Sequence, residues 1–76
     1  MSVHIGSHIE KVLREQGRSV SWFAKQINCE RTNVYSIFNR STIDTDLLLR
    51  ISKVLSYNFF QLYNDQLIQQ DDRNKE

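Results

Sequence analysis

The sequence predicts an all-α domain, and three observations lead to that fold class. Five segments repeat apolar residues at the three- and four-residue spacing that marks one face of a helix. Proline is absent from the 76 residues and glycine occurs only twice, whereas a strand-rich fold needs both residues for its turns. Side chains that cap helices precede three of the segments. We therefore expect helices joined by short loops.

The first two segments predict two helices on either side of Gly17. The first helix spans about residues 5 to 16, and Gly17 supplies a stop just beyond it. Ser19 is a good N-cap for the second helix, which lasts barely two turns. The inward stripes are Ile5, Ile9, Val12 and Leu13 in the first helix, and Val20, Phe23, Ala24 and Ile27 in the second.

A tight turn over residues 28–30 is expected to lead into the third helix. Asn28 stands where a helix ends in a left-handed residue, and asparagine tolerates a positive φ better than most side chains. The third helix spans about residues 31 to 39, and its apolar face consists of Val34, Ile37 and Phe38. Its opposite face consists almost entirely of side chains that form hydrogen bonds.

Two further helices follow the polar loop at residues 39–43. Asp44 caps the fourth helix, whose inward residues are Leu48, Ile51, Ser52 and Leu55, widened by Leu47 and Val54. Asn58 and Gln61 resemble a capping box that opens the fifth helix, with Phe59, Leu62 and Tyr63 as its inward stripe. Beyond Ile68 the apolar periodicity stops, and we expect a frayed end. The sequence thus predicts one domain at residues 1–63 and a polar C-terminal tail at residues 64–76.

The charges are distributed unevenly, although the net charge is only +1. Residues 18–40 contain four basic side chains against Glu30 alone, whereas residues 64–76 contain four acidic side chains against two basic ones. A local basic excess is a weak sign of a polyanionic partner, and a solvated surface explains it equally well.

Several classes of protein are excluded by what the sequence contains. No apolar run approaches the about 20 residues that span a bilayer, and the N-terminus has no export signal, so we expect a cytoplasmic protein without a membrane partner. The single cysteine, Cys29, forms neither an internal disulfide nor a structural zinc site, and we expect it to be a small buried hydrophobe.

Catalytic groups are also missing from the sequence. His4 and His8 have a metal-binding spacing, but no third ligand is near them in sequence, which favours a surface pair. There is no acid and base pair, no nucleophile with a base and no phosphate loop. We expect no enzyme activity, no cofactor, no metal and no small-molecule ligand.

The stretch that joins the second and third helices resembles a known family. From Phe23 to Val34 it reads FAKQINCERTNV, which is similar to the pattern of the Cro and lambda repressor-like (Xre) family. Ala24 matches the small residue that lets two helices cross closely. The resemblance continues through DTDLLLRISKVLSYNFFQL and covers about residues 5–63. It implies a five-helix domain with a helix-turn-helix, and a transcriptional regulator that binds double-stranded DNA sequence-specifically.

The resemblance also implies which residues contact DNA, with the third helix in the major groove. The base-reading residues would be Arg31, Thr32, Asn33, Tyr35 and Ser36, and the phosphate contacts would be Ser19, Asn39, Arg40, Ser41 and Thr42. The chemistry agrees, because arginine binds guanine O6 and N7 bidentately and a threonine methyl group contacts the thymine methyl group. Glu30 stands where the family favours serine, and its charge repels phosphate.

A homodimer on a two-fold operator is the third implication, because the family commonly dimerises through its C-terminal helix. The dimer candidates are Phe60 and Leu67, which lie seven residues apart and off the inward stripe. Trp22 lies opposite the stripe of the second helix, where it either covers the core from the side or contacts a partner. The alternative function is a protein-interaction module on the same fold, an antitoxin-like or adaptor subunit that uses Trp22 and the aromatic residues of the fifth helix.

Overall fold

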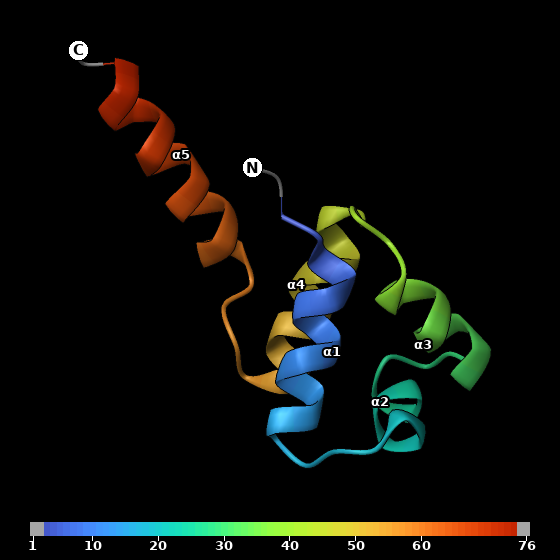
Figure 1. The fold of residues 1–76 in the computed structure, drawn as a ribbon. Helices are drawn as coiled ribbons and strands as arrows, with labels where there is room; N and C mark the ends of the chain where they lie inside the picture. The colour runs from blue at the N-terminus through green and yellow to red at the C-terminus, as the bar shows by residue number, and fades with distance from the viewer. Residues whose placement is uncertain (1–2, 75–76) are drawn as a thin grey trace.

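The computed structural model describes residues 3–74, which form five α-helices and no strand (Figure 1). The helices are α1 (Ile5–Glu15), α2 (Val20–Gln26), α3 (Arg31–Phe38), α4 (Thr45–Leu55) and α5 (Phe60–Asn74). The predicted all-α fold class is confirmed. The expected ends of the first and third helices are correct to within one residue.

Two of the predicted N-caps form as expected. The Trp22 amide donates to Ser19 Oγ over 3.0 Å, and the Leu47 amide donates to Asp44 Oδ1 over 2.8 Å. Each bond satisfies an amide in the first turn of its helix that has no partner within the helix. The starts of α2 and α4 are therefore fixed by local sequence.

Left-handed residues end three of the helices. Gly17, Asn28 and Ser56 have φ angles of 71°, 58° and 50°. In each case the next amide donates to a carbonyl five residues back: Arg18 to Leu13 (3.2 Å), Cys29 to Ala24 (2.9 Å) and Tyr57 to Ser52 (3.0 Å). The prediction for Asn28 is confirmed. Ser56 was not expected, because serine seldom adopts this conformation.

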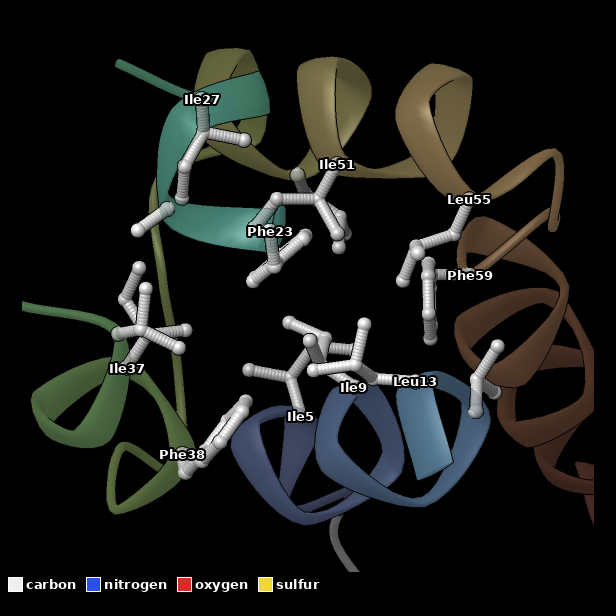
Figure 2. Close-up of a cluster of buried hydrophobic side chains, with 14 residues drawn as sticks. Ile5, Ile9, Leu13, Phe23, Ile27, Ile37, Phe38, Ile51, Leu55 and Phe59 are labelled. Carbon is white, nitrogen blue, oxygen red and sulfur yellow. The ribbon is translucent and has the colours of Figure 1, made fainter. Parts of the chain in front are cut away.

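The hydrophobic core lies between α1 and α4, with α2 and α3 on one side and Phe59 on the other (Figure 2). The predicted inward residues of the first four helices are buried, apart from Val20, Leu47, Ser52 and Val54, which are half-buried. Burying one large aliphatic or aromatic side chain stabilises a fold by about 1.5–3 kcal/mol. Packing therefore stabilises this domain, which contains no disulfide.

Helix α1 comes very close to the end of α3 at Gly6, in the first turn of α1. A Cβ atom at this position would lie 2.5 Å from the Phe38 carbonyl oxygen and closer still to that of Ile37. The Gly6 amide donates to Arg40 O over 2.9 Å, and the Ile5 amide donates to Ser41 O over 3.2 Å. The start of α1 is thus held against the end of α3 and the loop that follows it.

The fifth helix differs from its prediction in length. It continues to Asn74, so the expected frayed end beyond Ile68 is wrong, and most of the predicted polar tail is helical. Residues 75 and 76 lie outside the described part of the chain. Once the first turns of a helix are packed, further residues can extend it without an apolar face of their own. The glutamines in this segment also favour the helical conformation. As Figure 1 shows, α5 extends away from the other four helices, and the molecule is 47 Å long.

The start of α5 also differs from its prediction. Asn58 Oδ1 accepts a hydrogen bond from the Phe60 amide at 3.1 Å, two residues on, whereas a capping box uses the amide three residues on. Phe59 is fully buried but lies in the turn before the helix, so the helical spacing cannot be counted from it. As a result Tyr63, expected to point inward, is 38% exposed, while Phe60 is half-buried against the core.

Within residues 3–74 no helix combines the length and the apolar character that crossing a membrane requires.

The two glycines should respond very differently to alanine. We predict that Gly6→Ala lowers the free energy of unfolding by about 3 kcal/mol or more, because the added methyl group meets backbone atoms that cannot move aside. Gly17→Ala meets no atom within 4 Å and costs only the left-handed conformation, about 1–2 kcal/mol. Urea unfolding followed by circular dichroism measures both. Equal losses would contradict the close approach at Gly6.

Candidate functional site

The candidate site is built on α2 and α3, which lie next to one another across a tight turn (Figure 1). Ala24 is only 4% exposed, and its carbonyl accepts the Cys29 amide that closes the turn. Glu30 is the N-cap of α3, but its side chain makes no capping hydrogen bond. The direction of α3 is therefore set by the turn and by its buried face.

The outer face of α3 brings together the residues predicted to read bases. All five of them are exposed: Arg31, Thr32, Asn33, Tyr35 and Ser36. With 100° per residue, Thr32 and Ser36 lie opposite the buried face, Arg31 and Tyr35 lie on one flank, and Asn33 lies on the other. One helix thus presents hydroxyl, amide and guanidinium groups on a continuous surface.

Arg31 stands at the start of α3 and reaches back toward α2. Its Nη1 lies 3.4 Å from Ser21 Oγ, a long hydrogen bond that leaves the other guanidinium donors available. The side chains of residues 3–68 are described, and the ion pair among them is on α1. It joins Arg14 Nη2 to Glu10 Oε2 over 2.7 Å. Among these residues Arg31 forms no ion pair.

Tyr35 is held by an aromatic contact. Its ring meets the ring of the buried Phe38 edge to face, with centroids 6.1 Å apart and planes at 88°. This geometry is favourable for aromatic pairs and restricts the ring, while Tyr35 remains 49% exposed.

The residues predicted to contact phosphate lie on the loop after α3 and at the start of α2. Asn39, Arg40, Ser41 and Thr42 follow one another in the loop and are all exposed. The Arg40 and Ser41 carbonyls accept hydrogen bonds from α1, so the loop backbone is fixed while the side chains face outward. Ser19 is also exposed, but its Oγ is occupied as the cap of α2.

Trp22 covers the core from the side. It is half-buried, packs against the core cluster, and carries the Arg18 guanidinium carbon 4.4 Å above its ring. Such a cation–π contact is favourable even at a partly exposed site. Of the two alternatives for Trp22, the structure supports the covering role.

A hollow of about 240 Å³ adjoins the outer face of α3. Asn33, Ser36 and Arg40 form its polar wall, and the other lining residues are Ile27, Cys29, Ile37 and Leu47. Cys29, expected to be a small buried hydrophobe, packs against the core but is only half-buried. Burial, followed by the charge of the neighbouring Glu30, raises the pKa of the Cys29 thiol.

A second hollow, of about 330 Å³, lies where α4 and α5 diverge. It is lined by Thr42, Ile43, Thr45, Leu48, Phe60 and Tyr63. The prediction that Phe60 points away from the core is wrong, because this ring forms part of the wall and packs inward. Leu67 is 57% exposed, as expected, and Ile68 is 49% exposed nearby on α5. Tyr63, predicted to point inward, is part of this exposed apolar surface.

The described residues contain no group of three or more histidine, cysteine, aspartate or glutamate side chains that could hold a metal ion. No protein-family model, curated protein or solved structure matches the chain.

The surroundings of Cys29 should affect how fast its thiol is alkylated at a given pH. Alkylation by iodoacetamide requires the thiolate, so the half-maximal rate should fall at a pH above the ordinary thiol value. Glu30→Gln removes the nearby negative charge and should shift the midpoint to lower pH, while Glu15→Gln, on α1, should leave it unchanged. If the Glu30→Gln midpoint equals that of the parent, the charge has no influence on the thiol.

Proposed function

We propose that this protein binds DNA sequence-specifically and regulates transcription, with α3 as the helix that enters the major groove. The observation that carries the proposal is the outer face of α3, where five exposed polar side chains lie on a helix anchored by buried Val34, Ile37 and Phe38. A helix with its side chains is about 10–12 Å across, which fits the about 12 Å width of the major groove. The pair α2–α3 then acts as a helix-turn-helix of the lambda repressor-like kind.

The side chains of α3 suit the edges of base pairs. Arg31 has free donors for guanine O6 and N7, and Asn33 has the donor and acceptor pair that matches adenine. Thr32 offers both a hydroxyl group and a methyl group, the latter for thymine. These contacts distinguish bases, whereas contacts to phosphate only position the protein.

The loop at residues 39–42 supports the proposal from the side of the backbone. Its hydroxyl, amide and guanidinium groups follow the end of α3, where the DNA backbone passes a helix in the groove. Arg40 supplies the loop's positive charge, whereas Glu30 at the opposite end of α3 repels phosphate. The salt dependence of binding should therefore be modest for each copy, at about −0.9 in the log–log slope per phosphate contact.

Two copies are needed for useful affinity, because one helix reads only a few base pairs. We propose a homodimer on a two-fold operator, in which neighbouring copies raise each other's effective concentration. The exposed apolar residues Tyr63, Leu67 and Ile68 of α5, beside the hollow at Phe60, supply the contact surface.

The second candidate is a protein-interaction module on the same fold, in which an antitoxin-like or adaptor subunit binds another protein. The apolar hollow beside α5 favours it, since exposed apolar surface often marks an interface. Trp22 no longer supports it, because that ring packs against the core.

Selection from random duplex DNA separates the two candidates. The proposed function predicts an enriched motif with two-fold symmetry and half-sites about one helical turn apart. Recovery of unrelated sequences, with no enrichment over the starting pool, would refute sequence-specific DNA binding and leave the interaction module.

Arg31→Ala should weaken binding to the selected operator by about 1–3 kcal/mol and relax the preference at one base pair in each half-site, because a bidentate contact discriminates at that position alone. Arg14→Ala is the matched control. It removes the same charge from α1, where Arg14 pairs with Glu10, and should change affinity little. Fluorescence anisotropy with operators varied at each position measures both effects. Identical profiles for the Arg31→Ala variant and the parent would show that Arg31 reads no base.

Leu67→Glu should abolish cooperative binding to the full operator without unfolding the protein, because Leu67 is largely exposed and a charge there opposes apolar contact. Gln61→Glu places the same charge on an exposed position of α5 and serves as the control. Titration of full and half operators by gel shift gives the cooperativity. Full cooperativity in the Leu67→Glu variant would exclude this surface as the dimer contact.

A further inference from the structure

The first turn of α1 is capped by a histidine. The Ser7 amide donates to His4 Nδ1 over 3.2 Å, and Ser7 Oγ lies 2.9 Å from the same nitrogen. A ring nitrogen accepts a hydrogen bond from an amide only when it carries no proton. The bond from the Ser7 amide therefore requires an unprotonated Nδ1, whereas a protonated Nδ1 can only donate, with Ser7 Oγ as the acceptor within reach.

The amides next to this cap connect α1 to the loop at residues 39–42. Ile5 donates to Ser41 O and Gly6 donates to Arg40 O, at 3.2 and 2.9 Å. Both acceptors are in the loop whose side chains are proposed to contact phosphate. If the first turn of α1 frays, these two bonds are lost and the loop loses its backbone support.

We propose that His4 is a positioning residue for the DNA contacts of this loop, and that its neutral ring is required for that role. The inference rests on the DNA-binding function proposed above. A proton on Nδ1 turns the acceptor into a donor that faces the donating amide of Ser7, so the cap opens. It also places a positive charge at the positive end of the helix dipole, which further destabilises the first turn.

Charged and titratable groups stand on each of the elements that meet here. On α1 they are His8, Glu10, Lys11, Arg14 and Glu15, and in the loop they are Arg40 and Asp44. The Glu10 carboxylate pairs with Arg14 at 2.7 Å, and the Asp44 carboxylate accepts the Leu47 amide at 2.8 Å as the cap of α4. The last turn of α3 contributes one titratable side chain, Tyr35, beside Ile37 and Phe38.

The sign of the pH effect separates this role from an ordinary charge effect. A histidine that merely lies near DNA binds it more tightly when protonated, because the added positive charge attracts phosphate. Protonation of His4 acts in the opposite direction, since it releases the loop. DNA affinity should therefore be lower at acidic pH than at neutral pH.

The test compares four proteins on the selected operator at constant ionic strength, at about pH 7.5 and about pH 5.5. His4→Asn keeps a capping side chain that does not titrate, His4→Ala removes the cap, and His8→Gln removes the other histidine of α1. We expect the parent and His8→Gln to lose affinity about fivefold on acidification relative to His4→Asn, which should remain constant, and His4→Ala to bind weakly at both values. A pH profile of His4→Asn that matches the parent, or a parent that binds more tightly at low pH, overturns the inference.

Amide hydrogen exchange of the free protein tests the role of His4 in holding α1 and the loop without depending on DNA binding. Acidification should reduce protection at Ile5 and Gly6 in the parent but not in His4→Asn, after correction for the intrinsic pH dependence of exchange. Equal protection in the two proteins overturns the positioning role even if DNA binds. If no variant binds any duplex at about pH 7.5, the proposed function itself fails, and the positioning role for DNA fails with it.

Discussion

The close approach of α1 to the end of α3 is the constraint on which the rest of the structure depends. Gly6 lacks the side chain that would strike the Ile37 and Phe38 carbonyls, so the two helices pack almost backbone to backbone. Because the helices are so close, the Ile5 and Gly6 amides can donate hydrogen bonds to carbonyls of the loop after α3. On the same helix, Ile9 and Leu13 point into the core (Figure 2). A larger residue at Gly6 would displace both the core and the candidate site.

A rigid support and a polar surface are combined in α3. The helix is anchored to the core by its buried residues Val34, Ile37 and Phe38. Its start is fixed by the turn at Asn28 and its end by α1. The backbone that carries the exposed side chains is therefore ordered before a partner binds, which lowers the entropic cost of binding.

The features that the sequence predicted depend on residues close together in the chain. Ser19, Asp44 and Asn28 act on amides or carbonyls within five positions, so their roles follow from local pattern, as does the polar face of α3. The contact at Gly6 could not be predicted, because its partners are carbonyls on another helix and carbonyls have no sequence signature. The predicted inward face of α5 is wrong because Phe59 is buried but lies before the helix begins. Phe60 is therefore half-buried and Tyr63 is exposed, the reverse of the expectation.

We propose that the outer face of α3 and the loop after it form the contact surface for DNA. Nuclear magnetic resonance of the labelled protein, titrated with the selected duplex, tests this most directly. We expect intermolecular contacts from Arg31, Thr32 and Ser36 to base protons, with backbone shifts extending through residues 39–42. Contacts confined to α5 and the hollow beside Phe60, with α3 unperturbed, would contradict it.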